Sequence, residues 1–216
     1  MTSQLFLPNR ETQLVQRRYD RVARVYDGFE WMMERRARHW RRDLWARVAR
    51  GRILEMGVGT GKNIPYYPEH RELVAMDVSE RMLALAKGKA TQFRRAVELD
   101  LGDAQALSYP SESFDVVVAT FLFCSVPDPV RGLCQAKRVL KPGGQLLLLE
   151  HVLSRHFVLA TLMRWLDPIP AHLWGAHINR NTVGDVQRAG FVNIVETDLS
   201  LDVVKRIEAR APLTPA

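Results

Sequence analysis

Residues 53–63 read ILEMGVGTGKN, an apolar run followed by a loop with glycine at every second position. We expect a buried strand, a tight turn and the start of a helix, because glycine lets the backbone turn sharply and approach a ligand closely. The third glycine comes two residues after the second, which departs from the G-x-G-x-x-G spacing of dinucleotide sites. Glu55 stands just before the loop, where an acid suits an ammonium group and repels a pyrophosphate. The stretch therefore predicts a site for a small ligand, with a carboxylate or phosphate favoured at the helix N-terminus.

Three further apolar segments follow, and acidic residues stand near the ends of the first two. Residues 73–77, 97–104 and 114–119 are predicted strands of an open parallel sheet, the last of them apolar on both faces. Ser79 is expected to cap a helix that extends to about residue 89. Ligands bind at the carboxyl ends of such strands, so Asp77 is the expected acceptor for ribose hydroxyls. Each acid alone is more often a turn or cap residue, but their ordered positions together predict a nucleoside site.

Several motifs then point to one family. The pattern E-x-G-x-G-x-G at 55–61 resembles motif I of the class I S-adenosylmethionine-dependent methyltransferases, and RVLKPGG at 138–144 is a further signature of that class. The YD…YD segment at 19–27 is similar to that of ubiquinone- and menaquinone-biosynthesis methyltransferases. Similarity to the alkyl-thiol methyltransferases, often grouped with the phosphatidylethanolamine methyltransferases, is carried by GTGKNIPYYP (59–68), FLFCSVPDP (121–129), EHV (150–152), WLDP (165–168) and HINRNT (177–182).

The resemblance implies an α/β, Rossmann-like class I methyltransferase fold. Its seven-stranded, mostly parallel sheet would end in an antiparallel hairpin and carry an N-terminal helical cap. A single domain is expected, with residues 1–50 as the cap and 51–210 as the methyltransferase part. The cap should hold two helices broken near Gly28, and KPGG at 141–144 should separate a helix from the strand 145–150. An aromatic-rich insertion, 157–174, is expected to roof the acceptor pocket.

The resemblance also implies the cofactor, S-adenosylmethionine, and in-line transfer of its methyl group to a lipophilic thiol or a lipid- or quinone-like acceptor, with no metal. The implied cofactor-binding residues are Glu55, Gly57, Gly59, Gly61, Asn63, Asp77, Val78, Met82, Asp103, Ala104 and Thr120. The expected acceptor-side residues are Tyr19, Tyr26, Cys124, His177 and Arg180, with Tyr66 and Tyr67 near the pocket mouth. His151, with Tyr26, is the candidate for helping a thiol to lose its proton, because the thiolate reacts faster.

Three alternatives stay open beside this function. A phosphatidylethanolamine N-methyltransferase peripheral at the membrane fits the same motifs. A nicotinamide-dependent oxidoreductase is disfavoured by the glycine spacing and by Glu55. A membrane-binding protein would have the same fold but would not catalyse methyl transfer. The absence of an N-P-P-Y or D-P-P-Y motif after the fourth predicted strand argues against a nucleic-acid base methyltransferase.

Charge is concentrated near the N-terminus. Residues 10–50 hold twelve Arg, no Lys and six acids, a net +6 that accounts for most of the chain's +7. Such a basic helical segment predicts contact with an anionic membrane surface, unless it is only a solvated helical face. Two cysteines without metal-ligand spacing, no apparent signal peptide and no apolar run of about 20 residues predict a cytoplasmic protein, peripheral on the inner face of the membrane.

Overall fold

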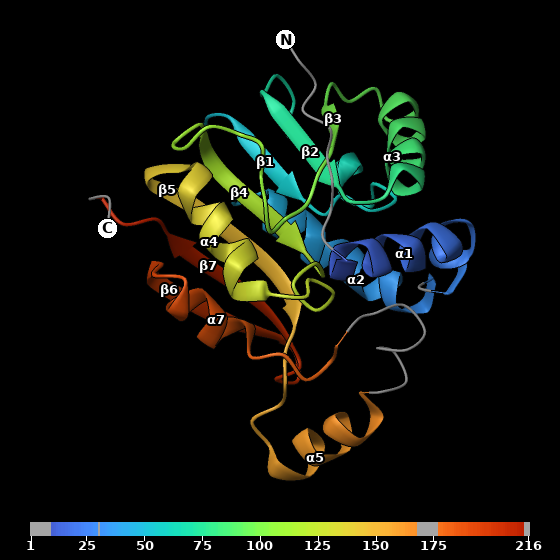
Figure 1. Cartoon of the computed structure of the whole chain (residues 1–216), viewed down its shortest axis with the longest axis vertical. Coiled ribbons are helices and arrows are strands. Elements are labelled where there is room, and N and C mark those ends of the chain that lie inside the picture. The colour runs from blue at the N-terminus through green and yellow to red at the C-terminus, as the bar shows by residue number, and fades with distance from the viewer. Residues whose placement is uncertain (1–9, 30, 168–176, 214–216) are drawn as a thin grey trace.

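A seven-stranded sheet forms the centre of the molecule (Figure 1), in the order β3-β2-β1-β4-β5-β7-β6. The structure, a computed structural model, describes residues 10–29, 31–167 and 177–213, and of residues 22–29 and 31–33 it describes only the backbone. The first five strands are parallel, whereas β7 pairs antiparallel with β5 and β6, which confirms the predicted sheet. The strands are β1 (Ile53–Met56), β2 (Leu73–Asp77), β3 (Glu98–Leu101), β4 (Phe114–Thr120), β5 (Leu140–His151), β6 (Val192–Ser200) and β7 (Val204–Arg210).

Helices cover both faces of the sheet, because successive side chains of a strand point to opposite faces. Ile53 of β1 joins an apolar cluster with α2 (Trp31–Trp45) and α3 (Glu80–Gln92). Leu54 joins the opposite cluster with α4 (Pro129–Val139) and α7 (Thr182–Arg188). The central strands are therefore buried on both sides, as their continuous apolar runs predict.

Polar side chains begin three of these helices. Ser79, Asp128 and Asn181 accept hydrogen bonds from the N–H groups of the first turns of α3, α4 and α7. Such caps satisfy donors that a helix leaves unpaired. The predicted cap Ser79 is confirmed.

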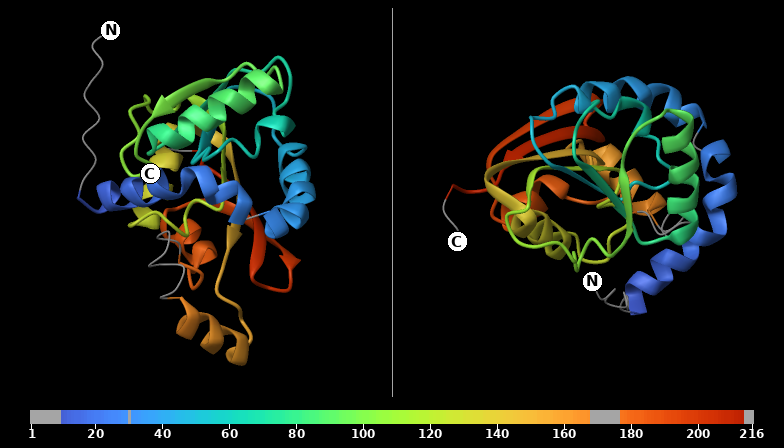
Figure 2. Two further views of the ribbon diagram at one scale, coloured as in Figure 1. Left: turned by 90° about the vertical axis from the view of Figure 1, so that its right-hand side faces the viewer. Right: turned by 90° about the horizontal axis from the view of Figure 1, so that it is seen from above.

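Two helices occupy the carboxyl end of the sheet. The α1 helix (Arg10–Phe29) is bonded to residues just after β2, β3 and β4, and α5 (Phe157–Leu166) stands apart beyond the end of β5 (Figures 1 and 2). Among the described helices, none is long and apolar enough to cross a bilayer.

Some predicted boundaries were wrong. After β1 only a 3-10 turn, η1 (Ile64–Tyr66), forms in place of a helix, because Pro65 and Pro68 restrict the backbone. The two N-terminal helices, by contrast, do separate near Gly28, since α1 ends at Phe29 and α2 begins at Trp31. The fifth strand starts at Leu140 rather than residue 145, since Leu140 pairs with Phe114 before KPGG loops out of register. The third strand ends at Leu101, before Asp103. Of the predicted insertion 157–174, residues 168–174 lie outside the described residues.

Two glycines of the loop after β1 allow a matched test of packing. Both have a positive φ, +81° at Gly61 and +53° at Gly59. A Cβ on Gly61 would lie 2.6 Å from Ile64 Cδ1 and 3.0 Å from the Ala86 backbone. No such neighbouring atom lies within 4 Å of the position that a Cβ on Gly59 would take. We expect Gly61→Ala to lower the free energy of unfolding by about 2 kcal/mol more than Gly59→Ala. Urea denaturation without ligand measures the difference, and equal losses would contradict the packing argument.

Candidate functional site

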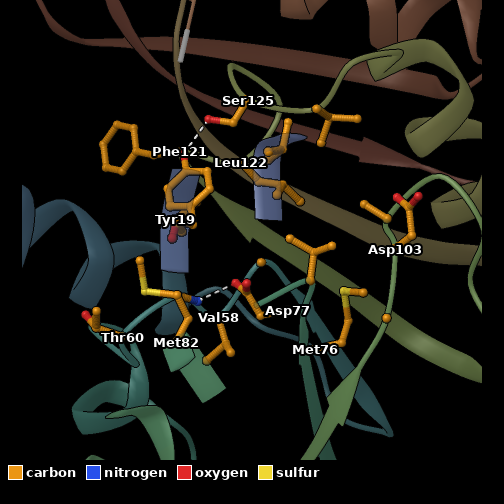
Figure 3. Close-up of a pocket in the computed structure, with 18 of the residues that line it drawn as sticks. Tyr19, Val58, Thr60, Met76, Asp77, Met82, Asp103, Phe121, Leu122 and Ser125 are labelled. Atoms are coloured by element: carbon orange, nitrogen blue, oxygen red, sulfur yellow. Dashed lines mark hydrogen bonds between the residues drawn. The ribbon is translucent and has the colours of Figure 1, made fainter. Parts of the chain in front are cut away.

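A cavity lies at the carboxyl end of the parallel strands (Figure 3), and its empty space, including the part open to solvent, is about 900 Å³. One wall comes from the loop after β1 and the ends of β2 and β3, and the other from α1 and residues 120–127. The lining residues are Thr12, Val15, Tyr19, Arg41, Gly57, Val58, Gly59, Thr60, Lys62, Met76, Asp77, Val78, Met82, Gly102, Asp103, Ala104, Thr120, Phe121, Leu122, Ser125, Val126 and Pro127.

Asp77 fixes the glycine loop at the end of β2. The Gly59 N–H donates to Asp77 Oδ2 at 2.8 Å, and the Ser79 N–H donates to Oδ1 at 3.0 Å (Figure 3 shows Asp77 in the cavity wall). Open space surrounds the position that a Cβ on Gly59 would take, so the backbone there can lie against a ligand. The loop and the acid form a cradle for a nucleoside, with carboxylate lone pairs left to accept from hydroxyl groups.

Glu55 lies behind this cradle and does not line the cavity. Its carboxylate is fully buried and accepts hydrogen bonds from Asn63 Nδ2, at 2.5 Å, and from the Tyr67 hydroxyl. Asn63 is also buried outside the lining, and so is Tyr67, which was wrongly expected near the pocket mouth. Burial raises the pKa of Glu55 to about 7, against the lowering effect of these two donors and of Arg41.

Arg41 of α2 is a site residue that motif reasoning missed. Its guanidinium is only 5 % exposed, lines the cavity and donates through Nη1 to Asn63 Oδ1 at 3.0 Å and to Thr120 Oγ1 at 2.7 Å. Glu34 lies 3.3 Å from Nε, and the Phe121 ring centroid lies 5.2 Å from Cζ. A buried guanidinium beside a cavity is suited to binding a ligand carboxylate.

The α1 helix closes the cavity through polar contacts at successive strand ends. Thr12 Oγ1 donates to Asp103 Oδ2 at 2.8 Å, and Tyr19 and Ser125 share a hydroxyl–hydroxyl bond of 2.6 Å (Figure 3). Ser79 Oγ donates to Asp20 Oδ1 at 2.5 Å. Thr12, Val15 and Tyr19, which line the cavity, recur at helical spacing and therefore share one face of α1.

The loop after β4 forms the remaining wall. The Leu122 and Phe123 N–H groups donate to Glu150 Oε1 at 2.9 and 3.1 Å, and Glu150 is fully buried at the end of β5. Cys124 is buried, with its thiol donating to the Phe121 carbonyl. Burial raises the pKa of Glu150 to about 7, although the N–H groups of Phe123, Leu122 and Cys124 oppose that rise. Glu150 is thus a loop-positioning residue.

The other acceptor-side residues support this loop from outside the cavity. The His177 N–H donates to the Cys124 carbonyl at 2.8 Å, and Arg180 Nη2 donates to the Val126 carbonyl at 3.1 Å. His177 Nδ1 lies 2.9 Å from Asp167 Oδ2. His151 packs against Phe121, with ring centroids 4.9 Å apart. Phe121 lines the cavity and separates His151 from it.

The structure brings most of the expected cofactor residues to the cavity and leaves a few behind it. Those that line it are Gly57, Gly59, Asp77, Val78, Met82, Asp103, Ala104 and Thr120. Glu55, Gly61 and Asn63 lie outside the lining. Of the acceptor-side set only Tyr19 lines it, and the side chain of Tyr26 lies outside the described residues. Within the described ranges no three His, Cys, Asp or Glu side chains are grouped to hold a metal ion.

Sequence comparison places the chain beside known methyltransferases. A family described as "Methyltransferase domain" matches residues 54–148. Phosphatidylethanolamine N-methyltransferase of Cereibacter sphaeroides is 38 % identical over 144 residues, 65 % of this chain and 70 % of that protein. Thiol S-methyltransferase TMT1B of Rattus norvegicus is 34 % identical over 66 % of this chain and 60 % of its own length. Demethylmenaquinone methyltransferase of Tropheryma whipplei (strain Twist) is 31 % identical over 71 % of this chain and 66 % of its own length.

Solved structures share the fold at low sequence identity. The [4+2]-cyclase SpnF superposes with a TM-score of 0.75 at 19 % identity, over 98 % of this chain and 100 % of its own. A possible histamine N-methyltransferase of Thermotoga maritima gives a TM-score of 0.70 at 22 % identity, over 90 % of this chain and 99 % of its own. One of these is described as a cyclase, so the fold does not by itself specify methyl transfer.

Glu150 provides a test of the site's electrostatics. An acid whose pKa is higher in the folded than in the unfolded chain stabilises the fold at low pH, and this contribution is lost as the pH rises through the folded value. For Glu150 that window extends from about pH 4.5 to about 7. We expect Glu150→Gln, which keeps an oxygen for the loop N–H groups, to be more stable than wild type at pH 8 by up to about 3 kcal/mol. Near pH 4.5 the two proteins should have similar stability.

Urea denaturation at the two pH values measures this difference. Glu112→Gln, a change at an exposed carboxylate, is the matched control and should leave the pH dependence unaltered. A stability difference between Glu150→Gln and wild type that does not change with pH would show that Glu150 is not held neutral by burial.

Proposed function

Because the chain belongs to the class I S-adenosylmethionine-dependent methyltransferases, we propose that it methylates a lipophilic small molecule, either a thiol or a lipid- or quinone-like compound. The observation that carries this proposal is the composition of the cavity. The carboxylates of Asp77 and Asp103 lie at the β2 and β3 side, while the wall opposite combines the polar groups of Thr12, Tyr19 and Ser125 with an apolar surface formed by Val15, Phe121, Leu122, Val126 and Pro127. This apolar surface favours an acceptor that leaves water readily. Relatives that methylate a thiol, a phospholipid and a quinone precursor, by their names, support the same class of acceptor.

The residues present fit the cofactor. Asp77 and Asp103 offer carboxylates to ribose hydroxyls and to the adenine amino group, and the open space at Gly59 admits the nucleoside against the backbone. We propose Arg41 as the partner of the carboxylate and the Glu55–Asn63 pair as the source of negative potential that favours the amine. When bound, S-adenosylmethionine supplies an electrophilic methyl group on a sulfonium.

The rest of the mechanism concerns the acceptor. The loop 120–127, held by Glu150, and the Tyr19–Ser125 bond shape the wall against which an acceptor would be oriented, and α1 excludes water from it. A thiol acceptor must lose its proton, and we propose that His151, which lies behind Phe121 and outside the lining, accepts that proton through water. Strong acid–base machinery is not required for this transfer, because a thiol is partly ionised near neutral pH.

Phosphatidylethanolamine N-methyl transfer is the second candidate function. It is favoured by the 38 % identical relative of that name, of which the chain covers 70 %. A methyl-transfer screen over alkyl thiols, quinols and phosphatidylethanolamine vesicles, with S-adenosylhomocysteine as the measured product, decides between the two.

Asp77 tests the proposed cofactor site. Asp77→Ala removes the proposed ribose acceptor and the anchor of the glycine loop, so we expect S-adenosylmethionine affinity to fall about 100-fold or more by calorimetry. Asp100→Ala, a change of the same kind in β3 away from the cavity, should bind normally. Equal affinity of Asp77→Ala and wild type, or binding of a nicotinamide dinucleotide instead, would overturn the proposal.

His151 tests the proposed proton transfer. We expect His151→Ala to lower the rate of thiol methylation about tenfold at pH 7 and much less at pH 9, where the thiol ionises without help. His70→Ala, at an exposed histidine, is the control. A His151→Ala profile with the same rate and pH dependence as wild type would remove the role.

A further inference from the structure

We infer that α5 is a membrane-anchoring helix whose exposed face inserts into the surface of a phospholipid bilayer next to the cavity. The inference deepens the proposed function, since it names the phase from which a lipophilic acceptor would come. Its basis is an apolar helix face that the described part of the molecule leaves uncovered.

Four of the six exposed side chains of α5 are large and apolar, and the other two are Thr161 and Arg164. Phe157 is 81 % exposed, Val158 80 % and Trp165 77 %, with Leu162 at 48 %. Residues 158, 162 and 165 recur at the spacing of one helix face, and residue 157 lies at its edge. A soluble helix normally turns polar groups to this side. The face therefore has the character of a buried surface without a covering element among the described residues.

The opposite face of α5 is already occupied by the protein. Ala160 and Met163 are buried, at 5 % and 9 % exposed, so the helix cannot rotate its apolar side inward without exposing them. Such a helix, apolar on both sides, is stable only if its second side is also removed from water.

The arginine-rich segment 10–50 offers a different kind of surface. The apolar side of α2 is packed into the sheet, with Leu44 and Trp45 at 0 % and 3 % exposed. Arg36 and Arg38 are exposed on the other side. The segment can attract anionic lipid by charge, but the apolar face of α2 is not available for insertion.

Charge identifies a lipid surface as the occupant of the α5 face. The helix carries no acid, and its one charged residue, Arg164, is exposed two turns after Phe157 on the same side of the helix, where its stem can lie on lipid while its head reaches phosphate. Tryptophan is enriched at the membrane–water interface. A second copy of this chain is disfavoured, because both copies would carry +7.

The position of α5 couples it to the cavity. The Leu153 N–H before the helix donates to the Arg180 carbonyl, and the His177 N–H after it donates to the Cys124 carbonyl in the cavity loop. Figures 1 and 2 show α5 beyond the carboxyl end of the sheet, the end that holds the cavity. Leu201, 78 % exposed, lies in the β6–β7 hairpin at the same end, where Val204 pairs with His151.

Vesicle flotation at low and high salt tests the inference, with phosphatidylcholine vesicles that contain or lack phosphatidylglycerol. We expect Phe157→Ser/Trp165→Ser to lower the vesicle affinity that persists at high salt about tenfold or more, because insertion is not screened. Leu213→Ser, at an 83 % exposed leucine near the opposite end of the sheet, is the matched control and should bind as wild type. Arg36→Gln/Arg38→Gln should weaken only the binding at low salt.

Further readouts separate this inference from the proposed function. Brominated lipid should quench wild-type tryptophan fluorescence more than that of Trp165→Phe. The double serine variant should bind S-adenosylmethionine with wild-type affinity. If the wild-type protein does not bind S-adenosylmethionine, that result counts against the proposed function and not against membrane anchoring by α5. Absence of vesicle binding, equal binding of the serine variant, or a wild-type dimer that the serine variant dissociates would each overturn the anchoring role.

Discussion

A carboxylate with no access to water holds the site together. Glu55 accepts from Asn63 and Tyr67, and Arg41 donates to both Asn63 and Thr120. Burying ionisable groups is costly unless they are paired, so each of these side chains depends on the others. The network joins β1, the glycine loop, β4 and α2. The α2 helix is therefore part of the site's framework, because it contributes the buried guanidinium of Arg41.

The central strands and the helix starts could be predicted because they depend on patterns that the chain displays locally. Apolar runs, glycine turns and the Ser79 cap each have a physical cause within a few residues of sequence. The boundaries that were wrong depend on distant partners. Leu140 joins β5 because it pairs with Phe114, and no feature of the KPGG sequence itself predicts that pairing.

The candidate site shows the same division. Asp77, at the end of β2, and Asp103, two residues after the end of β3, reach the cavity because residues that follow parallel strands gather at one edge of the sheet. Glu55 points away from the lining because the side chains of a strand alternate, and motif spacing does not state which face the ligand uses. Arg41 could have been found: Ala37, Leu44 and Trp45 lie four before, three after and four after it, so helical spacing places it on the buried face. A count of twelve arginines conceals that one of them belongs to the core.

The carboxylates that would receive the cofactor also hold the protein's own loops. Asp77 accepts from two backbone N–H groups, and Asp103 accepts from Thr12 and from the Gln105 N–H. A carboxylate has about four acceptor sites, so these contacts leave room for ligand donors. Thr12, however, stands on α1, and a ligand that needs the same oxygen of Asp103 must share it or move the helix. On the proposed function, cofactor binding and closure by α1 are therefore energetically linked, because they use the same lone pairs at the ends of the strands.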